Sequence, residues 1–462
     1  MKINFMTLTF FGGARSVTGA NYLLEVSGKK YLIDCGMIQG SEFSDEQNYQ
    51  PFPYNPGEIE AVLLTHAHVD HLGLLPKLCK EGFEGKIYST IPTKDLASPI
   101  FEDTLGLLLE QVEKEGKPML YGGEDVQKSL TLFEGIPYGK KIIINEDFSF
   151  CFRDAGHVLG SAIIEIWAKE PKGKKKSLRK VVFSGDLGNP PTPLLRPTEF
   201  IKEADYVVIE STYGNRLHED RDLRKSLLED AIEDTIAQKG VLMMPAFALE
   251  RTQELLYEFN ELVENHRIPL VPIFIDSPLA IKLTDIYKKY PDYFNDEARS
   301  LIKKGDELFN FSGLRLTKTV RESKEINGTA PPKIIVAGSG MSNGGRILHH
   351  ERRYLSGSKN LLLILAWQAA GSLGRRLLDG EKRVKIFDES VEVKCKIQAI
   401  GGYSAHPDQQ GLMAWIKRFE KPIRKVFVVQ GEEEAALALV TNIQDNLGIE
   451  AAAPMRGEKF EL

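Results

Sequence analysis

The sequence predicts an α/β protein that combines a layered, sheet-rich domain with an inserted domain built on a parallel sheet. Two changes in the pattern of apolar residues carry this prediction. Residues 8–210 show many short apolar runs with few helical patterns, whereas residues 214–378 alternate buried apolar runs with helical ones. Such alternation is typical of a parallel sheet covered on both faces. The end of the chain returns to the first style, so the middle is interpreted as an insertion.

Short apolar runs bounded by turn residues predict the strands of the first part. Two helical patterns, at 71–80 and 93–114, lie between them. The expected strands are 8–11, 22–26, 30–34, 61–65, 86–90, 148–153, 161–168 and 180–185.

Each apolar strand of the inserted part precedes a helical pattern, and a final strand and helix follow the insertion. The expected domain bounds are 1–212 and 379–462 for the two parts of the first domain and 213–378 for the insertion. The expected strand–helix pairs are 241–244 with 248–265, 270–275 with 279–289, 334–337 with 343–355, and 426–429 with 434–446, and a further strand is expected at 361–366.

Residues 66–71 place four potential metal ligands within six positions, directly after the apolar run 61–64. His66 and His68 are two residues apart, so on an extended backbone their side chains point the same way and could hold one ion. Asp70 and His71 follow where the chain turns into a helix, and they could serve a second ion. Imidazole suits zinc, and a carboxylate can complete a hydrolytic site. The spacing therefore predicts a site for two metal ions.

Three more residues fit the same site. His157, Asp186 and Asp34 each follow or end an apolar stretch and have a glycine nearby. A carboxylate that ends an apolar strand is a poor core residue and a good candidate for a site. Each of them alone could equally be a turn or capping residue. Together with the histidine cluster, they extend the predicted metal site.

The order of these residues resembles the motifs of the metallo-β-lactamase superfamily, and further segments resemble its nucleic-acid-processing branch, the β-CASP family. The resemblance runs from about residue 8 to residue 431. The closest pattern is that of prokaryotic relatives of the endonuclease subunit of the eukaryotic pre-mRNA cleavage and polyadenylation machinery. It implies an αββα sandwich with an inserted β-CASP domain. The segments that carry the β-CASP resemblance are 207–216, 245–256, 275–280, 337–346 and 402–408.

The resemblance implies a ribonuclease that holds two Zn²⁺ ions per chain and hydrolyses phosphodiester bonds of single-stranded RNA, with internal cleavage favoured. Two such ions lie about 3.5 Å apart in hydrolytic sites. The implied ligands are His66, His68 and His157 for one ion and Asp70, His71 and His406 for the other, with Asp186 bridging both and Asp34 fixing a ligand or the attacking hydroxide. The implied catalytic groups are Asp34, Asp70, Asp186, Glu210, His218 and His406.

RNA is expected to enter a cleft between the two domains, because both ends of the insertion flank predicted metal ligands. Such a slot admits a single strand and excludes an A-form duplex. The groups expected to meet RNA phosphates are the side chains of Arg251, Arg346 and Arg376 and the backbone N–H groups of Ser339, Gly340, Gly344 and Gly345.

One segment departs from the family pattern. Related endonucleases carry a histidine at the end of the segment 371–376, where this chain has Arg375 and Arg376. In the family that histidine pairs with Glu210 and donates a proton to the leaving oxygen. Arginine cannot do so at physiological pH, so His218 or a metal-bound water would supply the proton. His349 and His350 are expected to be partly exposed helix residues.

Other activities remain open at this point. A 5′-to-3′ exoribonuclease of the RNase J type shares the motifs, although only residues 407–462 follow His406, which is short for its usual extra C-terminal domain. A DNA-processing nuclease of the same family is a weaker alternative, because that branch typically has valine at the position of His406. A small-molecule hydrolase would lack the insertion. A non-catalytic scaffold would have lost some of the ligands.

Composition narrows the setting. The net charge of −6 argues against a broad basic surface for duplex DNA. Four cysteines without paired spacing favour a reducing cytoplasm. No apolar run approaches the length needed to span a bilayer, and the N-terminus predicts a first strand and no signal peptide. The expected partner is single-stranded RNA, no membrane is expected, and a single chain or a homodimer would both fit.

Overall fold

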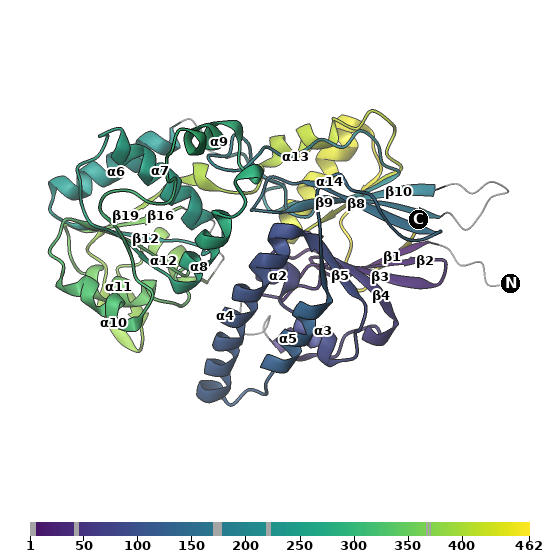
Figure 1. The fold of residues 1–462 in the computed structure, drawn as a ribbon, viewed down its shortest axis with the longest axis horizontal. Helices are drawn as coiled ribbons and strands as arrows, with labels where there is room; N and C mark the ends of the chain where they lie inside the picture. The colour runs from purple at the N-terminus through teal and green to yellow at the C-terminus, as the bar shows by residue number, and fades with distance from the viewer. Residues whose placement is uncertain (1–5, 41–45, 170–177, 219–222, 366–367, 369–370) are drawn as a thin grey trace. The chain divides into compact units, whose positions relative to one another are not determined.

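The computed structural model describes residues 6–40, 46–169, 178–218, 223–365, 368 and 371–462 (Figure 1). The chain forms two compact units. The first unit consists of residues 1–217 and 405–462, and the second consists of residues 218–404. Among the helices that the structure describes, none combines the length and apolar content needed to cross a bilayer.

The first unit is built on two seven-stranded sheets whose apolar faces pack against each other. Phe10, Leu24 and Ile33 of one sheet share a buried cluster with Phe150 and Ile164 of the other. Strands of the first sheet, in spatial order, are β22 (Lys459–Glu461), β1 (Thr7–Gly12), β2 (Asn21–Val26), β3 (Lys29–Ile33), β4 (Ile59–Leu63), β5 (Lys86–Thr90) and β6 (Phe133–Ile136). Strands of the second are β21 (Ala451–Ala452), β20 (Lys425–Val429), β11 (Tyr206–Glu210), β10 (Leu178–Phe183), β9 (Ala162–Lys169), β8 (Phe148–Asp154) and β7 (Ile142–Asn145).

Helices cover the outer faces of these two sheets, so the expected αββα sandwich is confirmed. α4 packs on β5 and β6 of one sheet, and α14 packs on β20 and β21 of the other (Figure 1). The helices of this unit are α2 (Val69–Leu72), α3 (Leu75–Lys80), α4 (Ile91–Glu115), α5 (Gly123–Leu132), α13 (Gln409–Ile416) and α14 (Glu433–Leu447), with short 3₁₀ turns η1 (Gln47–Tyr49) and η2 (Pro56–Glu58).

The direction of the strands brings the predicted ligands to one end of the sandwich. β3 and β4 run parallel in the first sheet, and β10, β11 and β20 run parallel in the second. Parallel strands have their carboxyl ends at the same edge. Asp34 follows β3, His66 follows β4, and Asp186 follows β10. Side chains from distant parts of the sequence therefore meet at this edge.

The single helix expected at 71–80 is two helices in the structure. α2 ends at Leu72 and α3 begins at Leu75. Pro76 lies in the first turn of α3, where a missing N–H costs no intrahelical hydrogen bond, and it could not have continued α2. α5, β6 and β7 were not expected from the sequence, because β7 is short and partly exposed and α5 is largely polar.

The second unit contains a six-stranded sheet in which every pairing is parallel, as the alternating pattern of the insertion predicts. In spatial order its strands are β14 (Leu314–Leu316), β13 (Ile273–Asp276), β15 (Lys333–Ala337), β12 (Val241–Pro245), β16 (Leu361–Ile364) and β19 (Lys396–Ala399). Its helices are α6 (Arg224–Ala237), α7 (Arg251–Glu264), α8 (Pro278–Tyr287), α9 (Asp296–Lys303), α10 (Val320–Glu325), α11 (Ile347–Tyr354) and α12 (Leu373–Leu378), with η3 (Pro291–Tyr293), η4 (Ile326–Gly328) and η5 (Gly401–Tyr403).

The second unit extends beyond residue 378, where the sequence suggested that the insertion ends. β19 pairs in parallel with β16, and the hairpin of β17 (Arg383–Ile386) and β18 (Glu389–Glu392) adds Val384 to the buried cluster around Leu362. The unit boundary therefore lies at residue 404. Short strands of this kind resemble those of the first domain, so the sequence pattern alone suggested an earlier return.

Candidate metal centre

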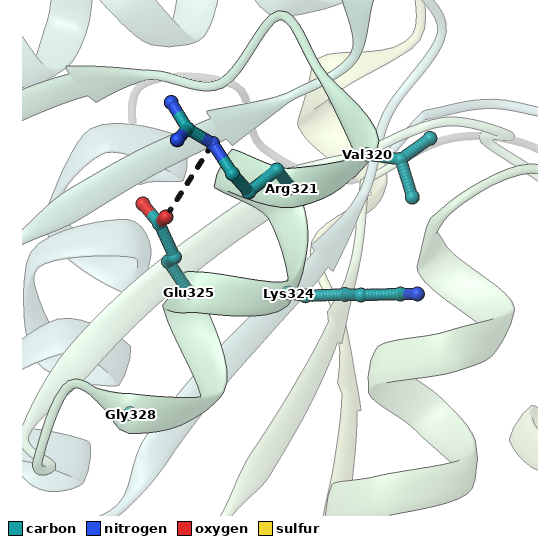
Figure 2. A pocket seen from close by; sticks show the side chains of 5 residues that line it. All are labelled: Val320, Arg321, Lys324, Glu325 and Gly328. Atoms are coloured by element: carbon teal, nitrogen blue, oxygen red, sulfur yellow. Dashed lines mark ion pairs between the residues drawn. The ribbon is translucent and has the colours of Figure 1, made fainter.

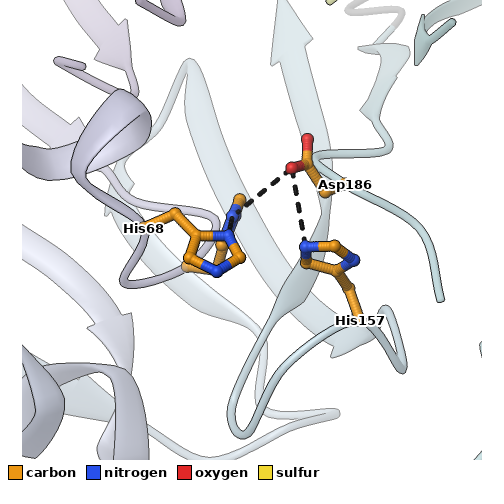
Figure 3. Close-up of side chains that lie close together, drawn as sticks. His68, His157 and Asp186 are labelled. Carbon is orange, nitrogen blue, oxygen red and sulfur yellow. Dashed lines mark hydrogen bonds and ion pairs between the residues drawn. The ribbon is translucent and has the colours of Figure 1, made fainter. Parts of the chain in front are cut away.

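Three histidines and one aspartate form a compact cluster in the first unit, in which all but the half-buried His68 are buried. One ligand atom from each of His66, His68, His157 and Asp186 lies within 4.8 Å of the others. The Asp186 Oδ2 atom is 3.5 Å from His66 Nε2 and 3.6 Å from His157 Nε2. Figure 3 shows Asp186 and His157 facing each other, with His68 beside them. His66 Nε2 and His68 Nδ1 are 2.9 Å apart. Sequence reasoning grouped these four residues, and the structure brings them together.

The local backbone explains how these side chains reach one point. His68 precedes α2 in an extended conformation, so the side chains of His66 and His68 fall on one side of the strand end. His157 lies in the turn after β8, where the Ser161 hydroxyl accepts hydrogen bonds from the N–H groups of His157 and Val158 at 3.0 and 3.2 Å. The turn is therefore held from within, independently of any bound ion.

A second group of side chains surrounds His71. Its Nδ1 atom lies 2.8 Å from Asp34 Oδ2, and its Nε2 atom lies 3.4 Å from Asp186 Oδ1 and 3.9 Å from Asp70 Oδ2. Asp34 also accepts hydrogen bonds from the N–H and hydroxyl of Thr65 at 2.7 and 2.8 Å. Asp34 therefore fixes the His71 ring with its Nε2 atom toward Asp186.

Close backbone approach is needed beside Asp34. A Cβ atom on Gly36 would lie 1.6 Å from the carbonyl oxygen of Asp70, which no side chain could accommodate. The Gly36 N–H donates to the Ala20 carbonyl, and the Cys35 N–H donates to the His71 carbonyl at 2.8 Å. The segment after β3 is thus bound tightly to the turn that carries Asp70 and His71.

Gln430 belongs to the centre, although sequence reasoning did not include it. Its Nε2 atom donates to Asp186 Oδ1 at 2.6 Å and lies 2.8 Å from His71 Nε2. The residue is buried and directly follows β20. A signal was present in the sequence, because a polar residue ends an apolar strand beside Gly431, as Asp34 ends a strand beside a glycine.

Buried Glu210 and half-buried His406 form a pair beside Asp186, and one ligand atom of each of the three lies within 4.8 Å of the others. His406 Nδ1 is 3.0 Å from one carboxylate oxygen of Glu210 and 3.2 Å from the other. Glu210 also accepts a hydrogen bond from the Leu187 N–H at 2.7 Å. Burial opposes protonation of His406, but the Glu210 carboxylate outweighs it and raises the pKa of His406 to about 9. The carboxylate thus holds the Nδ1 side of the ring.

Burial favours the neutral form of His66, His68 and His157. It lowers the pKa of His68 to about 4, and it lowers the pKa values of His66 and His157 well below the usual value. For His71, burial acts in the same direction, but the carboxylates of Asp186, Asp34 and Asp70 outweigh it and raise the pKa. A metal ion requires neutral imidazole, so the His66, His68 and His157 rings are already in the form that binds one.

The hydrogen-bond pattern of His157 tests whether the centre suits a metal. Both of its ring nitrogens are buried, and neither has a hydrogen-bond partner among the described residues. A buried polar atom without a partner is costly, and a cation at the point shared with His66, His68 and Asp186 would satisfy the Nε2 atom, which faces Asp186. The donor set of imidazoles and one carboxylate matches a transition-metal site. The cluster is a binding site for a divalent metal ion.

The three arginines expected to meet phosphates already have carboxylate partners in the second unit. Arg346 Nη1 lies 2.7 Å from Asp276 and donates to the Thr317 carbonyl at 3.1 Å. Arg376 makes two hydrogen bonds of 2.7 Å to Glu381. Buried Arg251 pairs with Glu254, one helical turn away. Any phosphate would have to compete with these carboxylates.

The loop after β15 carries the backbone groups expected to bind phosphate. The Ser339 N–H donates to the Gly344 carbonyl at 3.1 Å, so this donor is engaged within the loop. Gly340 is buried, and Gly345 adopts a positive φ of 72°. His218, considered as a proton donor, is the first residue of the second unit, whereas Glu210 belongs to the first.

His350 is buried, which corrects the expectation of a partly exposed helix residue. Its Nε2 atom lies 2.7 Å from Asp276 Oδ2. Burial would raise the pKa of Asp276, but hydrogen bonds from His350, Ser323, Thr317 and Arg346 lower it to about 2. Asp276 is therefore an ionised carboxylate that links the end of β13 to α11 through hydrogen bonds. The helical period of the sequence did not reveal this link, because the carboxylate lies on a distant strand.

Glu351 of α11 binds the loop that follows β15, and its ionisation should change the free energy of unfolding. The Ser342 hydroxyl donates to this carboxyl group, and burial raises the pKa of Glu351 to about 8. Because an unfolded chain releases this proton near pH 4.5, the free energy of unfolding should fall by up to about 1.4 kcal/mol per pH unit as pH rises toward 8. Glu351→Gln should remove this component, leaving the variant more stable than the parent at pH 7–8.

Chemical denaturation of the parent and Glu351→Gln between pH 5 and 9 would measure the difference. Glu325→Gln, an exposed position on α10, is the matched control and should leave the pH dependence unchanged. A parent-minus-variant difference that does not change with pH would contradict the assignment.

A surface hollow of about 690 Å³ lies at α10 in the second unit (Figure 2). Val320, Arg321, Lys324, Glu325 and Gly328 line it, and Arg321 pairs with Glu325 at 3.8 Å. Its lining contains none of the predicted metal ligands or phosphate contacts.

Comparison with known proteins gives matches along most of the chain. Residues 17–128 match the metallo-beta-lactamase superfamily, residues 252–377 match the Beta-Casp domain, and residues 390–454 match the Zn-dependent metallo-hydrolase RNA specificity domain. The chain is 37% identical to ribonuclease TTHA0252 of Thermus thermophilus, over 94% of this chain and 95% of that protein. It is 32% identical to an RNase J-like protein of Methanocaldococcus jannaschii, over 97% and 98% of the two chains.

Two further comparisons extend this result. The chain is 31% identical to transcription termination factor FttA of Methanosarcina mazei, over 98% of this chain and 71% of that protein. A crystal structure of a protein of unknown function from Enterococcus faecalis superposes with a TM-score of 0.56 at 12% identity, covering 99% of this chain and 100% of the other, which shows a shared fold. The resemblance noted from the sequence motifs is confirmed: the chain belongs to the β-CASP family of the metallo-β-lactamase superfamily and is a metal-dependent hydrolase.

Proposed function

We propose that the protein is a zinc-dependent ribonuclease that hydrolyses phosphodiester bonds of single-stranded RNA by internal cleavage, in RNA processing or decay. The observation that carries the proposal is the cluster of His66, His68, His157 and Asp186, in which the two ring nitrogens of His157 have no hydrogen-bond partner among the described residues. Two relatives that match over nearly their whole length carry the names ribonuclease and RNase J-like protein. The domain model that matches residues 390–454 is described as an RNA specificity domain. An exoribonuclease of the RNase J type is the second candidate, because that relative spans nearly the same length.

The proposal includes two Zn²⁺ ions per chain. His66, His68 and His157 would hold one ion, and Asp70, His71 and His406 would hold the other. Asp186 supports this division, since its Oδ2 atom faces His66 and His157 whereas its Oδ1 atom faces His71. When bound, two such ions would act as Lewis acids on the phosphate and generate a nucleophile from water at neutral pH.

The chain's own residues would hold this donor set in place. Asp34 fixes His71 through Nδ1, and Gln430 binds Asp186 Oδ1. Glu210 holds His406 through Nδ1. In the family, the glutamate that corresponds to Glu210 pairs with a histidine, in whose place this chain has Arg375 and Arg376. We infer that in this chain Glu210 positions His406, because a carboxylate on the distal nitrogen fixes the orientation of a ligand histidine and increases its basicity.

RNA should be cut in preference to DNA. The chain has His406 where DNA-processing relatives typically have valine, and its net charge of −6 disfavours nonspecific binding to duplexes. Single-stranded RNA and DNA of identical sequence should be compared under the same salt conditions, with a perfect RNA duplex as the control for strandedness. DNA cleavage as fast as RNA cleavage would contradict this prediction.

Internal cleavage can be separated from end-directed cleavage with one RNA prepared in three forms: 5′-triphosphate, 5′-monophosphate and circular. An endonuclease should cut the circular RNA and give the same internal products from both linear forms. Release of mononucleotides from the 5′-monophosphate form alone, with the circular RNA intact, would establish the exonucleolytic alternative.

The proposed setting is the cytoplasm, which the four buried cysteines support, because none of them forms a disulfide. The assembly proposed for test is a homodimer. Sedimentation velocity at several protein concentrations would distinguish it from a single chain.

A further inference from the structure

Phe247 is an exposed aromatic residue at the carboxyl edge of the parallel sheet in the second unit. It follows β12, and 37% of its surface is exposed, although Ala246 and Leu249 beside it are buried. A scattered exposed apolar side chain is ordinary on protein surfaces. Phe247 differs because its backbone and its ring are both held in place.

The first turn of α7 holds the backbone at this position. The Thr252 hydroxyl donates to the Phe247 carbonyl at 2.8 Å, and the buried Gln253 amide donates to the Ala248 carbonyl at 3.1 Å. Both side chains come from the helix that follows. The loop therefore presents the aromatic ring on a fixed support, with little conformational entropy left to lose on binding.

The ring rests against the backbone of Gly340, in the loop after β15. A Cβ atom at Gly340 would lie 2.7 Å from Phe247 Cδ2 and 2.9 Å from Cγ and Cε2, so any side chain there would displace the ring. The Gly340 carbonyl accepts a hydrogen bond from the Gln368 amide at 2.9 Å. The backbone of Gly340 thus supports one face of the ring, and the hydrogen bond from Gln368 holds that backbone in place.

The topology of the sheet points to the same place. β12 and β15 are parallel neighbours. From β12 the chain runs past β15 to β13, and from β15 it runs past β12 to β16. Ligands of open α/β sheets bind outside the carboxyl ends of the strands. Phe247 and Gly340 follow these two strands.

We propose that Phe247 stacks on a nucleobase of the bound RNA strand and so forms a base-binding subsite in the second unit. The proposal rests on the proposed function, because it takes single-stranded RNA as the ligand. Every base presents a flat π face, so an aromatic platform binds unpaired bases with little regard to sequence. Bases of a duplex are already stacked and would not be available. The subsite would therefore add to a preference for unpaired RNA.

Substitution of the ring tests the proposal. Phe247→Leu keeps an apolar contact with Gly340 and removes the flat ring, so it should raise the Kd and KM for single-stranded RNA by about 10-fold. Phe247→Trp should bind at least as well as the parent. Phe387→Ala is the matched control, because Phe387 is also exposed, at 46%, but lies in the turn between β17 and β18 against His349. Zinc content and thermal unfolding should be the same for all four proteins.

RNA with a single abasic ribose provides a test at the level of one base. Scanning the abasic position should identify one site that weakens binding to the parent by about 10-fold. Phe247→Leu should lose that site while keeping the rest of the profile. Gly340→Ala, which should displace the ring without removing it, should resemble Phe247→Leu.

Identical abasic profiles for the parent and Phe247→Leu would overturn the stacking role. If the parent cleaves RNA normally while Phe247→Leu keeps the parent Kd, the subsite is wrong and the proposed function stands. If the parent neither binds nor cleaves RNA, the proposed function fails and the subsite fails with it.

Discussion

Replacing Asp186 by Asn should lower the rate of RNA cleavage by about 10³-fold and leave one zinc ion or fewer per chain. Asp186 approaches both halves of the centre, at 3.5 Å from His66, 3.6 Å from His157 and 3.4 Å from His71. An amide offers only one oxygen and no charge, so it cannot serve both halves. Loss of one Lewis acid removes several kcal/mol of transition-state stabilisation, and about 4 kcal/mol corresponds to the 10³-fold effect.

Elemental analysis of protein purified without chelator would measure the metal, and single-turnover cleavage would measure the rate. Asp445→Asn, an exposed position on α14, is the matched control and should behave as the parent, with close to two zinc ions per chain. Removal of the metal by chelation should abolish the activity of the parent, and added zinc should restore it. An Asp186→Asn variant with two zinc ions and full activity would contradict the proposed role, as would an active, metal-free parent.

Replacing Glu210 by Gln should lower activity by about 10- to 100-fold through its effect on His406, the range typical of residues that orient metal ligands. The glutamine oxygen can still accept the hydrogen bond that Leu187 donates, so the fold around β11 should be kept. The variant loses the charge that holds His406 Nδ1. Zinc affinity should fall with activity, because one ligand loses its fixed orientation.

A double-variant comparison separates this role from an independent one. If Glu210 acts through His406, Glu210→Gln should add little to the effect of His406→Ala, because residues that act as a unit are not additive. Glu434→Gln, exposed on α14, serves as the control. Fully multiplicative losses in the double variant would show that Glu210 serves another group, such as a separate proton donor.

Several features of this protein followed from the sequence because they depend on neighbours along the chain. The apolar runs at 61–64 and 241–244 predicted strands that the structure contains as β4 and β12. The alternation of strands and helices predicted the parallel sheet of the second unit. His66 and His68 come together because an extended chain places every second side chain on the same side, whatever the rest of the fold does.

Only the tertiary structure decided which residues from distant strands meet. Gln430 reaches Asp186 because β20, β11 and β10 lie side by side, and Glu210 reaches His406 in a segment that returns to the first unit nearly two hundred positions later. Arg346 pairs with Asp276 for the same kind of reason, since β13 and the start of α11 are separated by 70 residues. Strand order sets these contacts, and it depends on packing of whole sheets. Local patterns of hydrophobicity and residue spacing therefore do not predict the order of the strands.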